Sequence, residues 1–273
     1  MSSGLERIAE AFASAGAEGR RAALMPYLMG GYPDLDTSRR IGLAYAESGA
    51  DLVEFGIPFS DPLADGPVVH AAGTAALAAG ATVETVLEVG AAIAERVPVV
   101  VMCYANTIFV RGVERFADAL VDASASGLIV PDLPLEEGNK LVGACERRGI
   151  ALVEMVAPTT PDERMARIAA GARGFLYAVG FTGTTGERDG LGGELAGVLA
   201  RAKAHATVPV AAGFGISNPA QASAAADAGA EGVIIGSRLV RAVGEETDPV
   251  GAAGTLVRAF SDALEVGDAT PAR

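Results

Sequence analysis

The feature that most constrains the fold is a regular alternation of short apolar runs with stretches of helical spacing. Such alternation is typical of a parallel sheet whose strands are joined by crossover helices. Eight units of this kind in one chain favour a closed (β/α)8 TIM barrel, with an open doubly wound sheet as the alternative. The runs, rich in Val, Ile and Leu, lie at residues 24–29, 52–56, 97–103, 127–131, 151–156, 174–179, 208–213 and 232–236.

No segment between these units has the composition of a linker, so we expect one TIM-barrel domain over residues 1–273. Residues 1–20 place Leu5, Ile8 and Phe12 at amphipathic spacing and predict a short extra helix before the first strand. Residues 265–273 are expected to form a disordered tail.

End signals flank two of the helical stretches. TSRRIGLAYAESG offers Thr37 or Ser38 as the N-terminal cap and Gly49 as the stop. NPAQASAAADAG has Pro219 in its first turn and Gly229 at its end.

Composition and charge limit the possible partners. No apolar run reaches the roughly 18 residues of a membrane span, and the first residues lack an apolar signal core, so we expect a cytoplasmic protein. A formal net charge of -13 opposes binding to nucleic acid or to an anionic membrane. Any phosphate on a substrate must therefore be held locally, and backbone amides are the expected donors.

Glu54 interrupts a buried strand, and Asp65 follows it on a loop rich in proline and glycine. Burying an unpaired carboxylate costs several kcal/mol, so Glu54 needs an explanation. One explanation is a structural arginine partner. The other is a general acid or base whose pKa is raised by its apolar neighbours, with Asp65 serving the other end of the same proton transfer.

Three glycine-rich segments follow the later strands, where barrels of this type commonly bind phosphate. Glycines let backbone amides approach an anion, and the turn that begins at Ser237 offers free amides with partial positive charge. Simple turns are the alternative at each place. The segments are GFTGTTGERDGLGG (180–193), AAGFGISNP (211–219) and IIGSRLV (234–240).

The residue inventory narrows the chemistry. The only lysines, Lys140 and Lys203, lie in helical stretches outside the barrel mouth, so a Schiff-base aldolase has no candidate nucleophile. The only histidines are His70 and His205, and without a His or Cys cluster a zinc site is not expected. We therefore expect neither metal nor cofactor, and acid and base chemistry on carboxylates alone.

The stretch EFGIPFSDPLADGP (54–67) closely resembles the signature of the tryptophan synthase alpha subunit family. Further motifs follow in the family's order: PYLMGGYPD, YANTIF, GLIVPDLPLEE, APTTPDER, TGTTG, GFGIS and IIGS. The resemblance implies a single barrel that cleaves indole-3-glycerol phosphate to indole and glyceraldehyde 3-phosphate. By analogy, Glu54 matches the catalytic acid and base, Asp65 the acid that meets the indole N–H, and Tyr177 an active-site tyrosine.

The same resemblance implies the remaining site residues. The threonine of the closing loop after the sixth strand is Thr185. The indole pocket matches Leu24, Met102, Tyr104 and Ile129, with plain core packing as the alternative. The phosphate site, with its two neighbours, matches Gly186, Gly213, Phe214, Gly215, Gly236 and Ser237.

The resemblance also implies a tryptophan synthase beta subunit as partner, in a complex of the alpha2beta2 type. Phe181 and Thr184 depart from the family's usual arginine and valine in the loop that helps communicate with that partner. The alternatives are a stand-alone indole-3-glycerol phosphate lyase of a specialised indole pathway, or a non-catalytic barrel that activates a partner. Indole-3-glycerol phosphate synthase is a poorer match because it relies on a strand-end lysine.

Overall fold

The structure, a computed structural model, describes residues 2–180, 193–213 and 215–266. Eight parallel strands pair in the order of the sequence, and β8 returns to β1, which closes the barrel. This closure confirms the predicted (β/α)8 barrel over the open sheet. The strands are β1 (Ala23–Met29), β2 (Val53–Gly56), β3 (Val99–Met102), β4 (Gly127–Ile129), β5 (Ala151–Val156), β6 (Leu176–Val179), β7 (Val210–Gly213) and β8 (Gly232–Ile235).

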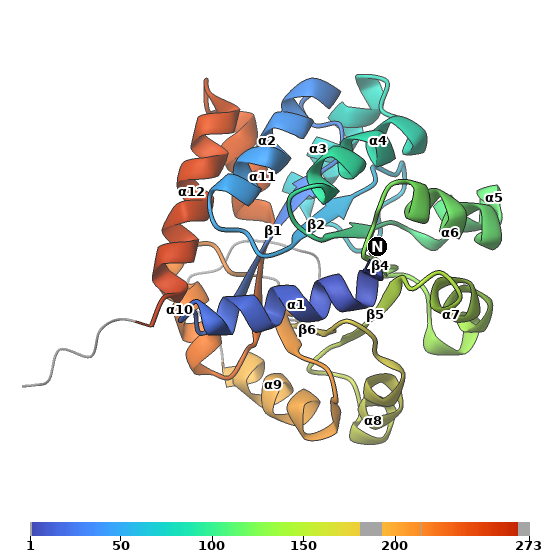
Figure 1. The fold of residues 1–273 in the computed structure, drawn as a ribbon, viewed down its shortest axis with the longest axis vertical. Coiled ribbons are helices and arrows are strands. Elements are labelled where there is room, and N and C mark those ends of the chain that lie inside the picture. Colours follow the sequence, from blue (N-terminus) through green and yellow to red (C-terminus); the bar gives the residue numbers. More distant parts are fainter. Residues whose placement is uncertain (1, 181–192, 214, 267–273) are drawn as a thin grey trace, which may run out of the picture.

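Helices surround the strands in Figure 1 and cover the outer face of the barrel. One large apolar cluster fills the layer between strands and helices, and a second fills the barrel interior. The helices after the first strand are α2 (Leu35–Glu47), α3 (Pro67–Ala78), α4 (Val83–Ala94), α5 (Ala105–Arg111), α6 (Val113–Asp122), α7 (Asn139–Glu146), α8 (Asp162–Gly171), α9 (Gly193–His205), α10 (Pro219–Asp227), α11 (Ser237–Glu245) and α12 (Pro249–Leu264), with one 3-10 turn, η1 (Leu135–Glu137).

The predicted leading helix is present as α1 (Gly4–Ala17), and it begins at a capping box formed by Ser3 and Glu6. Ile8 and Ala15 of α1 belong to the interior cluster, so this helix closes the end of the barrel at which the strands begin. Figure 1 shows α1 lying across the strands at that end. The helix α1 does not cover the opposite end, where the strands finish, and that end is the expected place for an active site.

The structure differs from the predicted disordered tail at residues 265 and 266, which are hydrogen-bonded. Glu265 forms an antiparallel bridge with Arg20, and the Val266 amide donates to the Gly19 carbonyl at 2.8 Å. These contacts bring residues 265 and 266 back against the segment that follows α1. Residues 267–273 lie outside the described part of the chain.

The start of α2 also differs from the prediction. Asp34, not Thr37 or Ser38, is the N-cap, and its carboxylate accepts the Thr37 amide at 2.9 Å and the Thr37 hydroxyl at 2.7 Å. The Ser38 hydroxyl instead accepts the Gly31 amide at 3.1 Å. The predicted stop is confirmed, since Gly49 has a φ of +100° that favours glycine.

No single helix among those described is long and apolar enough to cross a membrane, and α3 with α4, which pass that test only as a pair, are bent by 111°.

Candidate active site

Glu54 lies on β2 in the barrel interior. It is in register with Tyr27 on β1 and with Val100 on β3, the two neighbouring strands. It is 3% exposed, and its Oε2 has no hydrogen-bond partner among the described residues. Burial and then the charge of Asp65 raise the pKa of Glu54 to about 8. The described part of the chain gives Glu54 no cationic partner, so the explanation by a structural arginine is not supported there. The raised pKa instead favours the protonated acid near neutral pH.

Asp65 stands on the loop between β2 and α3 and is half-buried. Burial raises its pKa, while a hydrogen bond with the Tyr104 side chain and the charge of His70 act in the opposite direction. The two carboxyl groups thus differ in surroundings. Glu54 is enclosed without a described cation, whereas Asp65 keeps a hydroxyl and an imidazole that favour its charged form.

Tyr104 ties this loop to the barrel. Its hydroxyl accepts the Ala64 amide at 3.0 Å, and its ring stacks on Phe59 with centroids 5.3 Å apart. Tyr104 is buried at 3% exposure. The residue predicted to line an indole pocket therefore also holds Asp65 in place.

Tyr177, on β6, points into the interior and is 4% exposed. Burial, followed by the charges of Glu54 and Tyr27, raises its pKa well above the ordinary value, so the phenol stays protonated and can donate. A Cβ atom on Gly213 would overlap the Tyr177 hydroxyl. Gly213, predicted to lie beside the phosphate, is thus required in this structure as room for Tyr177.

Gly236 is the N-cap of α11, directly before Ser237, at the end of β8. Among the described residues, a Cβ at Gly236 would meet no atom closer than Tyr27 Cβ at 3.9 Å, so these residues leave the space above this backbone open. Gly215 has a φ of +86°, a left-handed conformation that favours glycine. Free amides of a helix start beside open space suit an anion. Gly186, Phe214 and Thr185 lie outside the described residues.

The predicted indole-pocket residues divide between two layers. Met102 and Ile129 face the interior cluster, where an aromatic ring could lie against them. Leu24 does not, because it packs in the outer layer with Leu28 and Tyr45. The prediction for Leu24 is therefore wrong, and the physical reason is the two-residue period of a strand, which points residues 23, 25, 27 and 29 inward.

Tyr27 is the interior residue of β1 that the sequence prediction missed. It is 5% exposed and lies in register with Glu54. A phenol within an otherwise apolar buried strand is the signal that could have identified it, because a buried tyrosine hydroxyl normally needs a partner.

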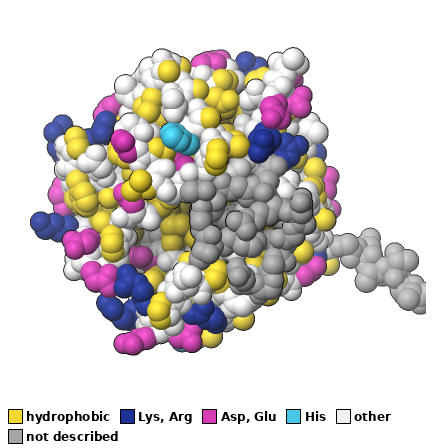
Figure 2. All heavy atoms as spheres, turned by 180° about the vertical axis from the view of Figure 1, so that it is seen from behind, with side chains coloured by type: hydrophobic (Ala, Val, Ile, Leu, Met, Phe, Trp, Pro, Cys, Tyr) yellow, Lys and Arg dark blue, Asp and Glu magenta, His cyan; other side chains and the backbone are white. Residues whose placement is uncertain are grey.

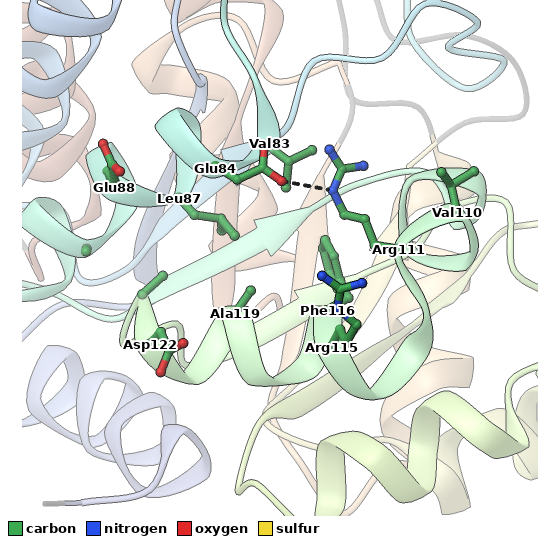
Figure 3. Close-up of a pocket in the computed structure, with 12 residues that line it drawn as sticks. Val83, Glu84, Leu87, Glu88, Val110, Arg111, Arg115, Phe116, Ala119 and Asp122 are labelled. Atoms are coloured by element: carbon green, nitrogen blue, oxygen red, sulfur yellow. Dashed lines mark hydrogen bonds and ion pairs between the residues drawn. The ribbon is translucent and has the colours of Figure 1, made fainter.

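Other features of the described residues lie away from this mouth. A groove of about 560 Å³ runs along the outer flank between α4 and α6, and an ion pair between Glu84 and Arg111, with atoms 3.3 Å apart, spans one side of it (Figure 3). It contains none of the predicted site residues. No group of three or more His, Cys, Asp or Glu side chains in the described segments could hold a metal ion.

Comparison with known proteins gives consistent matches. The family model "Tryptophan synthase alpha chain" matches residues 12–267. The alpha chain of Prochlorococcus marinus (strain MIT 9313) is 48% identical over 236 residues, 86% of each chain. That of Synechococcus elongatus is 43% identical over 260 residues, 94% of this chain and 97% of its own.

Solved structures agree. A structure of Mycobacterium tuberculosis tryptophan synthase superimposes with a TM-score of 0.89 at 37% identity, covering 96% of this chain and 99% of that one. A tryptophan synthase alpha-subunit from Pyrococcus furiosus gives 0.82 at 31% identity, covering 89% and 98%. With most of its length matched by the family model and by these relatives, the chain belongs to the tryptophan synthase alpha chain family.

Proposed function

We propose that the protein is a lyase of tryptophan biosynthesis that cleaves indole-3-glycerol phosphate to indole and glyceraldehyde 3-phosphate. The observation that carries the proposal is the buried carboxyl group of Glu54 on β2, one oxygen of which has no hydrogen-bond partner among the described residues. A carboxyl group with a pKa of about 8 is mostly protonated at neutral pH and can deliver its proton to carbon.

The reaction needs one proton moved between two atoms of the substrate. Glu54 protonates C3 of the indole, and the ring nitrogen takes up the positive charge as an iminium. The bond between C3 and the glycerol carbon then breaks, and its electron pair restores the aromatic ring. The hydroxyl on that carbon returns a proton to Glu54 and becomes the aldehyde, so Glu54 ends as it began.

Asp65 supports this step as an anion. Burial raises the pKa of Asp65, while its hydrogen bond with Tyr104 and the charge of His70 act against that rise and favour the carboxylate, which can accept the indole N–H and stabilise the iminium. Tyr177, held protonated, is a donor for the reacting hydroxyl. Met102 and Ile129 offer apolar contact for the ring.

The phosphate site combines the turn at Gly236 and Ser237 with Gly215, Gly213 and the undescribed Gly186 and Phe214. The space that the described residues leave above Gly236 and the start of α11 support this assignment. Thr185, also outside the described residues, is assigned to the closing loop. No lysine or metal enters the mechanism.

For the partner, we propose a tryptophan synthase beta subunit in an alpha2beta2-type complex. Support comes from large apolar side chains exposed near the loop of Asp65, with Leu63 84%, Phe109 52% and Val110 75% exposed. Beside them lies a groove of about 400 Å³, which Pro58 and Asn106 help to line. Hydrophobic side chains also lie exposed among charged ones on the face turned away from Figure 1, shown in Figure 2. Exposed apolar patches of this kind mark interaction sites.

The test is direct measurement of indole released from indole-3-glycerol phosphate by the purified protein, alone and with a beta subunit. We expect release in the presence of the beta subunit and none from Glu54→Gln under the same conditions. A comparable rate without the subunit would support a stand-alone lyase. No indole in either case would overturn the proposed reaction.

A further inference from the structure

Tyr27 is a buried phenol at the barrel mouth to which the proposed chemistry gives no role. Its hydroxyl has one described hydrogen-bonding contact, a weak one to the Met29 sulfur at 3.9 Å. Buried hydroxyl groups normally find a stronger partner. The Tyr27 hydroxyl therefore keeps capacity to donate to a bound molecule.

The side chain leans toward the open end of the barrel. Tyr27 is in register with Glu54, yet a Cβ atom on Gly56, two residues farther along β2, would overlap the Tyr27 hydroxyl and meet its ring. The phenol therefore crosses over β2 on the side where the strands finish. Gly56 leaves it the room to do so.

Tyr27 also stands between the two ends of the proposed site. Strand β1 pairs with β2 on one side and with β8 on the other. On the β2 side Tyr27 is level with Glu54, and on the β8 side its Cβ is the nearest described atom to a Cβ position on Gly236, at 3.9 Å. A molecule with its phosphate at Gly236 and its reacting carbon at Glu54 must cross Tyr27.

The surroundings keep the phenol protonated. Burial, together with the charges of Asp65, Glu54 and Tyr104, raises the pKa of Tyr27 well above its ordinary value. A protonated phenol beside acids can donate to a hydroxyl of the ligand and accept from another.

We infer that Tyr27 is a substrate-contact residue whose hydroxyl hydrogen-bonds the hydroxylated three-carbon chain between the phosphate and the indole ring. The inference rests on the proposed function, since it takes the phosphate at Gly236 and the reacting carbon at Glu54. It assigns the middle of the substrate to a residue of β1, the strand that joins those two ends.

The test replaces Tyr27 by phenylalanine, which removes the hydroxyl and keeps the ring. The dissociation constants of glycerol 3-phosphate and of inorganic phosphate are measured for wild type and Y27F, with KM and kcat for indole release. We expect glycerol 3-phosphate binding to weaken roughly three- to tenfold, as for one lost hydrogen bond, with a similar rise in KM. Inorganic phosphate, which lacks the carbon chain, should bind both proteins equally.

Tyr45→Phe is the matched control. Tyr45 is a buried tyrosine of α2 whose hydroxyl donates to the Tyr27 backbone carbonyl at 3.3 Å from the outer layer, away from the mouth. Y45F should leave the affinity for glycerol 3-phosphate unchanged.

Three outcomes would overturn the inference. Equal glycerol 3-phosphate affinity in Y27F and wild type would remove the contact with the chain. Equal weakening of both ligands would place Tyr27 at the phosphate instead, and a shift of the pH profile with unchanged affinities would mean that it acts only through Glu54. Wild-type protein that releases no indole with a beta subunit would refute the proposed function, whatever Y27F does.

Discussion

The hydroxyl of Tyr177 occupies the space in which a side chain on Gly213 would stand. Tyr177 is in register with Ala211 on the neighbouring strand, so its phenol leans over the residue two positions farther along. Tyr27 and Gly56 repeat this relationship on β1 and β2. Each of the two tyrosines thus extends toward the barrel mouth over a glycine of the next strand. The position of each phenol therefore depends on a neighbouring residue that has no side chain.

Gly213→Ala should therefore damage the site through Tyr177. The added methyl group would overlap the hydroxyl and two ring carbons of Tyr177, and overpacking of this kind costs about 1–3 kcal/mol of stability. We expect a lower midpoint of thermal unfolding and a fall in kcat from the displaced phenol. Unfolding curves and indole release measure both, and wild-type values for the two would show that the overlap is relieved without consequence.

Gly236→Ala is the contrasting substitution at the proposed phosphate site. Of the described residues, its methyl group would meet only Tyr27, at 3.9 Å from the Tyr27 Cβ, which is ordinary contact, so the fold should tolerate it. The methyl would nevertheless occupy the open space over the start of α11. We expect an unchanged unfolding midpoint and a KM raised by roughly tenfold, as for loss of about 1.4 kcal/mol of binding. An unchanged KM would move the phosphate elsewhere.

Glu54→Gln should abolish most turnover, because the amide fills the same space and cannot transfer a proton. Loss of a general acid typically lowers kcat by about 10²- to 10⁴-fold. At alkaline pH the variant should also be more stable than the wild type. The pKa of Glu54 is raised from its ordinary value of 4.5 to about 8 in the folded protein, so the wild type loses stability as pH rises from 4.5 toward 8, and the variant does not. Denaturant unfolding across that range checks the sign, with Glu54→Asp as a variant that keeps the carboxyl.

The pH profile of the wild-type enzyme should follow the same group. With a pKa raised to about 8, Glu54 is protonated below that pH and loses its proton above it. Because the first step needs the acid form, kcat/KM should be level below pH 8 and fall as pH rises beyond it. Steady-state rates of indole release between pH 6 and pH 10 test this, and a profile that stays level to pH 10 would contradict the assignment of Glu54 as the acid.

Much of the fold was predictable because a parallel barrel repeats one local pattern. The strands are short, mostly apolar runs and the helical stretches between them have their own spacing, so element order needed no long-range information. The error at α2 has a local cause. Asp34 and Thr37 can each serve as a cap, and only the structure shows that the Thr37 amide and hydroxyl are the groups capped by Asp34.

The site was less predictable where side-chain direction decides. Glu54 and Asp65 stood out because charge in a buried strand and acids on a glycine loop are costly or unusual. Leu24 was assigned to the indole pocket by resemblance to the family, and its all-apolar strand shows no alternation that could have corrected the assignment. Tyr27 and the role of Gly213 follow from contacts between neighbouring strands, which depend on register.

A buried ion pair at the other end of the barrel gives a test of stability separate from the site. The carboxylate of Asp51 accepts from Arg20 at 2.5 and 2.7 Å and from the Leu24 amide at 2.8 Å. Removing one partner of a buried ion pair costs about 3–5 kcal/mol when the other charge is left without compensation. Arg20 would keep the Glu18 carboxylate at 2.8 Å and the Gly49 carbonyl at 3.0 Å, so Asp51→Ala should lower the free energy of unfolding by up to about 3 kcal/mol at pH 7.5.

Asp227→Ala is the control for this substitution. Asp227 pairs at 2.6 Å with Arg21, the residue after Arg20, but the Asp227 side chain is 64% exposed. Exposed pairs contribute about 0–1 kcal/mol, so D227A should be nearly neutral. Asp51→Asn, which keeps an acceptor for the Leu24 amide, should fall between the two. Urea unfolding of the three variants and wild type gives the comparison, and equal stabilities for D51A and D227A would mean that the Asp51 pair carries no more weight than a surface one.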